Sequence, residues 1–267
     1  MNQSLQGWRC YPALAVFLFI AVLPSASADQ VSVAVAANFT EAARELAARF
    51  EEVTGHRARL SFGATGQFYA QISNGAPYEV FLAADAARPR MAESTGHAVK
   101  GSRFTYARGA LVLVSDHAGK FGDGPAFLQS GRYKRLAIAN PDTAPYGLAA
   151  RQALQKLGLW KQLQQKIVRG NSIAQTYQFV ATSNADIGFV ATSQVIAREA
   201  KDGKTFGSSW LVPATLHEPI EQQAVLLTRG ADSEAANAYM AFLKSDVARK
   251  VIARYGYALP QPDTAER

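Results

Sequence analysis

Strand-like and helix-like segments alternate along most of this chain. Residues 31–36 are an apolar, β-branched run typical of a buried strand, and the apolar side chains of residues 40–53 recur at helical spacing. The alternation continues over residues 59–62, 67–73, 79–83, 135–139, 147–157, 173–181 and 187–190, with further strands at 103–107, 111–115 and 222–228 and two helices within 234–255. The pattern predicts an α/β fold in which mostly parallel sheets are flanked by helices.

Four short polar steps each lead into a predicted helix. They are residues 37–40, 63–66, 144–147 and 171–173. The first turn of a helix has backbone N–H groups without acceptors, and the helix dipole favours an anion there. Four such steps on two halves of one chain predict a cleft that closes on a small oxyanion, and this favours a binding protein over an enzyme.

The first 28 residues have the pattern of a secretory signal peptide. Arg9 is the single charge before an apolar run over residues 13–23, and Ala26-Ser27-Ala28 matches a small-residue cleavage site. The eleven apolar residues are too few to span hydrocarbon, which needs about 20. The pattern predicts cleavage after Ala28 and export to the periplasm. Cys10 is the only cysteine, so the mature chain has neither a disulfide nor a thiolate metal site.

Charge and side-chain chemistry exclude several classes of function. The chain has 28 Lys and Arg against 21 Asp and Glu, scattered without the aromatic interleaving typical of a nucleic-acid groove. Its four histidines have no metal-ligand spacing and are expected on the surface, and no Gly-x-Ser-x-Gly motif is present. Glu79, Asp85 and Asp186 are interpreted as capping or packing groups. We therefore expect neither nucleic-acid binding nor catalysis.

Four segments carry a resemblance to a known family: AANFTEAARELAARFEEVTG, NGAPYEVFLAAD, NPDTAPYGLAARQALQKLGLW and ADIGFVATSQV. Together they resemble the periplasmic molybdate-binding proteins of bacterial ABC importers, over residues 31–260. The resemblance implies a two-lobed type II periplasmic binding protein with its ligand in the interlobe cleft. Lobe one would comprise residues 29–106 and 222–267 and lobe two residues 107–221, with hinge crossings near 104–109 and 219–223.

The resemblance also implies which residues hold the anion. It places side-chain donors at Asn38 and Thr65 and backbone amides at Tyr146 and Ile173, so that these residues hold molybdate through its oxygens. Four further residues are expected just behind these contacts: Ala37, Ala64, Ser172 and Ala191. Some family members have a donor Tyr where this chain has Ala191, so Tyr146 or a water is expected to compensate.

The predicted function is capture of molybdate, and of tungstate, for delivery to the membrane permease of an ABC importer. Neutral donors can hold such a dianion without a buried Lys or Arg. No cofactor is expected, and a hinged receptor is expected to be a monomer. A receptor for another tetrahedral oxyanion, such as sulfate, thiosulfate, chromate or phosphate, stays open because the same donors would serve. An enzyme or a sensory domain is the third alternative.

Overall fold

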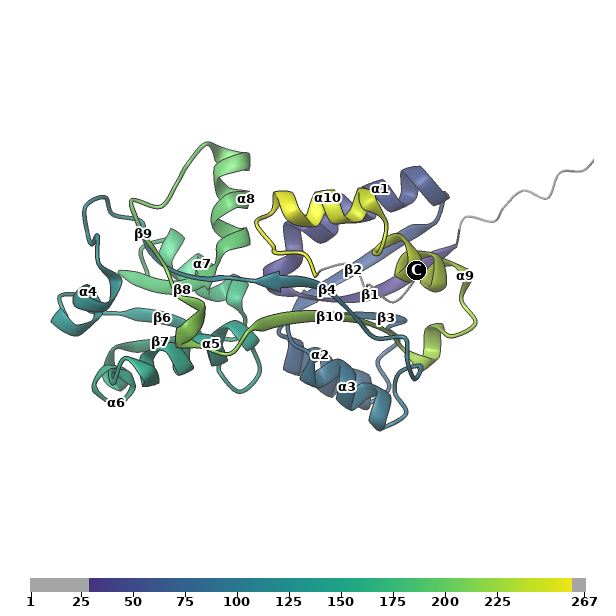
Figure 1. Ribbon diagram of the computed structural model, residues 1–267, viewed down its shortest axis with the longest axis horizontal. Helices are drawn as coiled ribbons and strands as arrows, with labels where there is room; N and C mark the ends of the chain where they lie inside the picture. The colour runs from purple at the N-terminus through teal and green to yellow at the C-terminus, as the bar shows by residue number, and fades with distance from the viewer. Residues whose placement is uncertain (1–28, 261–267) are drawn as a thin grey trace, which may run out of the picture.

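The computed structural model describes residues 29–260 and contains two five-stranded sheets. The predicted signal peptide, residues 1–28, lies outside the described residues. The two sheets form separate lobes along the long axis of the molecule, and β4 and β10 run towards the boundary between them (Figure 1). Within residues 29–260, no helix has the length and apolar character needed to cross a membrane.

The sheet of lobe one has the order β2-β1-β3-β10-β4. Its strands are β1 (Gln30–Ala36), β2 (Arg57–Gly63), β3 (Val80–Ala83), β4 (Phe104–Gly109) and β10 (Ile220–Leu226). Its helices are α1 (Thr40–Thr54), α2 (Thr65–Ser73), α3 (Ala87–Ser94), α9 (Glu234–Phe242) and α10 (Asp246–Arg254), with short 3-10 turns η1 (Ala37–Phe39) and η4 (Thr228–Gly230).

The sheet of lobe two has the order β7-β6-β8-β5-β9. Its strands are β5 (Leu111–Ser115), β6 (Leu136–Ala139), β7 (Ile167–Gly170), β8 (Ile187–Ala191) and β9 (Ser208–Leu211). The helical segments after them are α4 (Gly124–Ser130), α5 (Pro145–Lys156), α6 (Trp160–Leu163), η2 (Gln164–Lys166), α7 (Ile173–Ala181), α8 (Thr192–Asp202) and η3 (Ala214–Leu216).

Strand direction confirms the mostly parallel α/β expectation. In lobe one only β10 opposes the other strands, because it pairs antiparallel with both β3 and β4. In lobe two only β5 does so, since it pairs antiparallel with β8 and β9. The remaining strands of each sheet share one direction, so their carboxyl ends and the helix starts that follow them meet at one edge.

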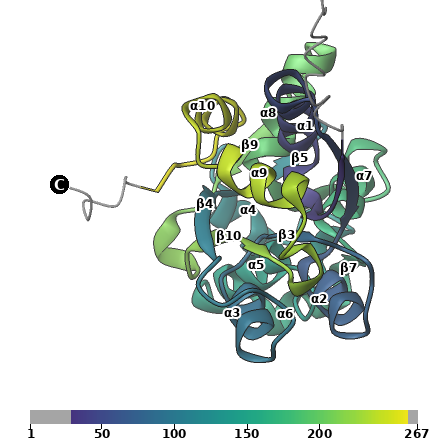
Figure 2. The same ribbon diagram turned by 90° about the vertical axis from the view of Figure 1, so that its right-hand side faces the viewer.

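Both faces of the first sheet are covered, which explains why β1 is apolar at nearly every position. Val31, Val33 and Val35 pack with α1, α9 and α10 on one face. Ala34 packs with α2 and α3 on the other. Figure 2 shows these two helix layers above and below the sheet. The register pairs Ala36 with Gly63, so the ends of β1 and β2 reach the interlobe boundary together.

The chain passes between the lobes twice. β4 ends at Gly109 and β5 begins at Leu111, while β9 ends at Leu211 and β10 begins at Ile220. The lobe boundaries expected at 106/107 and 221/222 fall inside β4 and β10, because these strands keep hydrogen bonds to each other along the first sheet up to the crossing. The residue-level division into lobes stays a prediction.

Several elements were not predicted from the sequence: helices α3, α4, α6 and α8 and strands β7 and β9. β7 and β9 are the two edge strands of their sheet, where partial exposure weakens the apolar pattern. In α8 only Ser193 is buried, and its apolar residues, such as Val195, are partly exposed. All four histidines were expected on the surface, and this is wrong for His56 and His217, which are each 7% exposed.

Candidate functional site

Residues from both lobes enclose a small cavity at the carboxyl ends of the central strands. Its volume is about 10 Å³, close to the least that admits one water molecule. All four residues expected to hold the anion line it: Asn38, Thr65, Tyr146 and Ile173. Ala37 and Ala64 line it as well. The structure thus brings together residues more than 130 positions apart in the sequence.

Three helical segments begin at this cavity without a side-chain cap. η1, α2 and α5 are preceded by Ala36, Ala64 and Ala144, whose side chains accept no hydrogen bond. Side chains cap α4, α7, α9 and α10; in α9 and α10, Ser233 and Ser245 accept from the third residue, each at 3.2 Å. A buried helix start that has no cap calls for another acceptor, and an anion in the cavity would supply it.

The backbone N–H groups of Tyr146 and Ile173 lie in the first turns of α5 and α7, where a helix has no acceptor for them. Pro145 occupies the first position of α5 and has no N–H, so the first donor of that helix is Tyr146. Ile173 is 3% exposed and its side chain belongs to the core of lobe two. Only its amide can therefore contribute polar chemistry.

The hydroxyl of Thr65 is oriented by a backbone N–H of the same lobe. Its Oγ1 accepts the N–H of Ala84 at 3.0 Å, and the residue is 1% exposed. With an acceptor site occupied by Ala84, the hydroxyl hydrogen remains available for a different partner. Since Thr65 lines the cavity, this arrangement suits donation to an anion.

The side-chain amide of Asn38 is already engaged. Its Nδ2 donates to Gln222 Oε1 at 2.9 Å and to Tyr257 Oη at 3.0 Å. An amide nitrogen has two hydrogens, so both are accounted for in this structure. The backbone N–H of Asn38 lies in the first turn of η1 and is the donor that this residue can offer to the cavity.

The Tyr146 hydroxyl points to the hinge. Gln222 Nε2 donates to its Oη at 3.3 Å, and a Cβ on Gly109 would overlap it. Burial raises the pKa of Tyr146 well above its usual range; nearby tyrosines add to this, and hydrogen bonds with Gln222 and Asn38 offset a smaller part. The hydroxyl is therefore neutral. It lies beside Gln222 and Gly109 and does not take the place of the Tyr donor that is missing at position 191.

Two of the expected supporting residues lie outside the lining of the cavity. Ser172 caps α7, since its Oγ accepts from Gln175 N at 3.3 Å. Ala191 is the buried last residue of β8, and its N–H donates to Gln194 Oε1 at 3.0 Å. Ser172 thus shapes the start of the helix that presents the Ile173 amide.

Within the part of the chain that the structure describes, no residue that lines the cavity has a charged side chain. The carboxylates singled out from the sequence act elsewhere, as expected. Asp186 accepts the N–H groups of Lys134 and Arg135, each at 2.9 Å, and Glu79 accepts the N–H of Ser32 at 2.7 Å. Asp85 caps α3 and pairs with Arg88 at 2.8 Å. Within residues 29–260, no group of His, Cys, Asp and Glu is placed to hold a metal ion.

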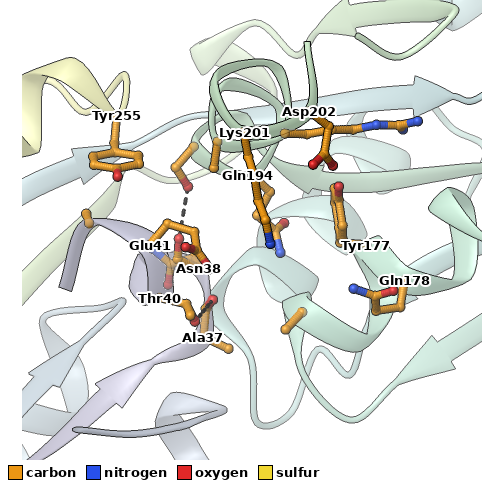
Figure 3. A pocket seen from close by; sticks show the side chains of 15 residues that line it. Ala37, Asn38, Thr40, Glu41, Tyr177, Gln178, Gln194, Lys201, Asp202 and Tyr255 are labelled. Atoms are coloured by element: carbon orange, nitrogen blue, oxygen red, sulfur yellow. Dashed lines mark hydrogen bonds between the residues drawn. The ribbon is translucent and has the colours of Figure 1, made fainter. Parts of the chain in front are cut away.

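A wider groove of about 320 Å³ lies beside the cavity and shares Ala37 and Asn38 with it. Figure 3 shows the start of α1 with Thr40 and Glu41 on one side and Tyr177, Gln178 and Gln194 of α7 and α8 opposite. The lobes also touch directly: Gly66 N donates to Thr143 O at 2.8 Å, next to the cavity residues Thr65 and Ala144, and Arg88 Nη2 donates to Asp142 O at 3.1 Å. The structure therefore shows the lobes in contact around the cavity.

The residues that sequence reasoning missed are Tyr106, Ser193, Gln222 and Tyr257, which bond to Asn38, to Tyr146 or to each other. The signal that could have found them is the pair of amides at 222 and 223 inside the otherwise apolar run of β10. Buried polar side chains need partners, and such a pair points to a polar network.

Comparison with known proteins agrees with this geometry. The family model of bacterial extracellular solute-binding proteins matches residues 31–258. The molybdate-binding protein ModA of Azotobacter vinelandii is 55% identical over 236 residues, which is 88% of this chain and 92% of that protein. The protein of the same name from Rhodobacter capsulatus is 51% identical over 257 residues, or 96% of this chain and 99% of that protein.

A solved structure extends the agreement to the fold. The periplasmic molybdate-binding protein of Azotobacter vinelandii superposes with a TM-score of 0.81 at 43% identity, covering 86% of this chain and 100% of that one. The type II periplasmic binding protein fold and the resemblance to the molybdate-binding proteins are both confirmed. The chain belongs to the bacterial extracellular solute-binding protein family.

Proposed function

We propose that this protein captures molybdate, and tungstate with it, in the periplasm and delivers the ion to the membrane permease of an ABC importer. The observation that carries the proposal is the convergence of uncapped helix starts and the Thr65 hydroxyl on one cavity that spans both lobes. The relatives with 55% and 51% identity are named for molybdate binding, which supports molybdate as the ion.

The donor set suits a fully deprotonated dianion. The donors named above are N–H or O–H groups, so they stabilise oxygens that carry no proton and offer no acceptor to a partly protonated phosphate. Each hydrogen bond to a charged group contributes about 1.5–3 kcal/mol, so a handful outweighs the cost of ordering and lobe closure. No charged partner in the cavity is needed, because dipoles fixed by the fold supply the positive potential.

Size is the property left to discriminate among tetrahedral dianions. Sulfate and molybdate have the same charge and shape, and donors at fixed positions bind best the ion whose oxygens reach them all. Groups from both lobes line the cavity, so its dimensions depend on how the lobes close. We therefore infer selection by cavity size, with no cofactor and no catalytic step.

The proposal is tested by calorimetric titration of ligand-free protein, purified after export and stripped of bound anion by unfolding and refolding. Molybdate, tungstate, sulfate and phosphate are titrated in parallel. One-to-one binding of molybdate and tungstate without heat from sulfate supports the proposal. Tighter binding of sulfate or phosphate contradicts it and points to another importer.

Two further measurements test the setting of this function. The intact mass of the exported protein is expected to match a chain that begins at Asp29, as cleavage of residues 1–28 requires. Sedimentation with and without molybdate is expected to show a monomer in both states, since lobe closure takes place within one chain. A retained N-terminus or a stable dimer would contradict these parts of the proposal.

A further inference from the structure

Gln222 is a fully buried side chain that joins the two halves of the cavity. It lies in β10, the strand that enters lobe one after the second crossing. Its Oε1 accepts from Asn38 Nδ2 at 2.9 Å and from Tyr106 Oη at 3.1 Å. Its Nε2 donates to Tyr146 Oη at 3.3 Å. One planar amide thus bonds to lobe one on one side and to lobe two on the other.

Two of the three partners of this amide are cavity residues. Asn38 and Tyr146 line the cavity from opposite lobes, and each offers a backbone N–H through the first turn of its helix. The side chains of the same two residues meet at Gln222. The separation between these two donors is therefore set by a short path of side-chain hydrogen bonds as well as by the backbone.

Asn38 is held from a further direction. Tyr257 Oη donates to the Asn38 carbonyl at 2.8 Å. Ser193 Oγ of lobe two donates to the same oxygen at 3.0 Å, and a dashed line in Figure 3 ends at Asn38. Tyr257 is 5% exposed and Ser193 is 6% exposed. Because every member of this network has a partner, the network is rigid where it meets the cavity.

The first crossing is shaped to admit the network. Gly109 is the last residue of β4 and lies against the Tyr146 hydroxyl and Gln222 Nε2, at a position where any side chain would overlap them. Both crossings therefore flank the Tyr146–Gln222 hydrogen bond. A change in the angle between the lobes would move α5 relative to β10 and alter this bond.

We propose that Gln222 is a positioning residue that sets the spacing between the two halves of the anion cavity in the closed protein, and through it the selection of oxyanions by size. This inference rests on the proposed function. Without the amide, the lobes close to a less defined spacing, and a cavity of loose dimensions discriminates poorly between ions that differ only in size.

The neighbouring Gln223 provides a matched control. It is the same residue type in the same strand, 6% exposed, and it also makes side-chain hydrogen bonds. Its partners, Arg103 Nη1 at 2.9 Å and Thr105 Oγ1 at 3.1 Å, both belong to lobe one. Gln222→Met and Gln223→Met each remove an amide while retaining similar volume, and only the first removes a link between the lobes.

The experiment measures three quantities for wild type and both variants: the dissociation constants of molybdate and sulfate, the molybdate dissociation rate, and the unfolding midpoint of the ligand-free protein. Gln222→Met is expected to weaken molybdate binding about tenfold, the effect of losing one interlobe hydrogen bond. Its dissociation rate rises and its sulfate-to-molybdate ratio of dissociation constants falls. Gln223→Met is expected to shift the unfolding midpoint alone.

An unchanged sulfate-to-molybdate ratio in Gln222→Met, or the same change in Gln223→Met, overturns the inference. If Gln222→Met fails to fold, Tyr146→Phe removes the other end of the same bond and carries the test with the same expected ratio. When both fold, the double variant is expected to lose no more affinity than the weaker-binding single variant, and additive losses count against the inference. Failure of wild type to bind molybdate refutes the proposed function instead, so the two failures are distinct.

Discussion

Replacement of Thr65 by Val tests two roles of one hydroxyl: accepting a backbone N–H and, as we propose, donating to the anion. Val keeps the branched shape of Thr and loses the oxygen that accepts the Ala84 N–H at 3.0 Å. It also loses the hydrogen available to the anion. A hydroxyl that served only the anion could be removed without affecting the ligand-free protein, but the bond to Ala84 makes an effect on both expected.

The magnitudes follow from the burial of the site. A buried N–H left without an acceptor costs about 1–3 kcal/mol, and Thr65 is 1% exposed, so water does not replace the lost oxygen. The unfolding midpoint of ligand-free Thr65→Val should fall by about 3–10 °C. Loss of one hydrogen bond to a charged ligand should raise the molybdate dissociation constant by about 10- to 100-fold.

Thermal unfolding of the ligand-free protein and calorimetric titration with molybdate measure the two effects independently. Thr65→Ser keeps the hydroxyl and should retain most of the affinity. Ser115→Ala is a control for stability alone, because the buried Ser115 Oγ bonds to Asp186 O at 2.8 Å in lobe two, away from the cavity. If Thr65→Val is destabilised yet binds molybdate with wild-type affinity, the hydroxyl serves the fold only and the donor assignment is refuted.

Three further predictions concern the hinge and pH. Gly109→Ala places a Cβ against the Tyr146 hydroxyl and should lower the unfolding free energy by about 1–3 kcal/mol; adding Tyr146→Phe should recover part of the loss in thermal unfolding, and additive losses would contradict the overlap. Burial raises the pKa of four tyrosines, Tyr106, Tyr146, Tyr239 and Tyr257. The stability that each neutral hydroxyl contributes to the folded protein is complete below the unfolded pKa of about 10. It is lost as pH rises towards the folded pKa, at about 1.4 kcal/mol per pH unit for each tyrosine. In urea unfolding above pH 10, Tyr146→Phe should reduce the pH slope by one proton, and equal slopes would refute this. For Asp186, burial alone would raise the pKa, but hydrogen bonds from Arg135 and Lys134 outweigh it and lower the pKa; Asp186→Asn should therefore reduce stability at pH 7, with the difference from wild type shrinking as pH falls below about 4, and a constant difference in urea unfolding would exclude the linkage.

The α/β class and the helix starts that meet at the cavity were both predictable from the sequence, and their assignment to an anion stays a prediction. Each depends on local order: an apolar strand such as residues 31–36 followed by a polar step and an amphipathic helix produces an open helix start wherever the fold places it. The Ala residues before η1, α2 and α5 are a local signal too, because they remove the usual side-chain cap. The family resemblance added the pairing of these steps across two lobes.

The direction in which each side chain points was decided by tertiary structure. Asn38 looked like a side-chain donor, yet its amide bonds to Gln222 and Tyr257, which follow it by 184 and 219 positions. Tyr146 was a candidate for a second donor, yet its hydroxyl lies at the hinge beside Gly109. The sequence determined where backbone donors would be exposed, because capping is local. Only the folded chain determined which polar groups were already satisfied, because hydrogen-bond partners so distant in sequence leave no periodic pattern to detect.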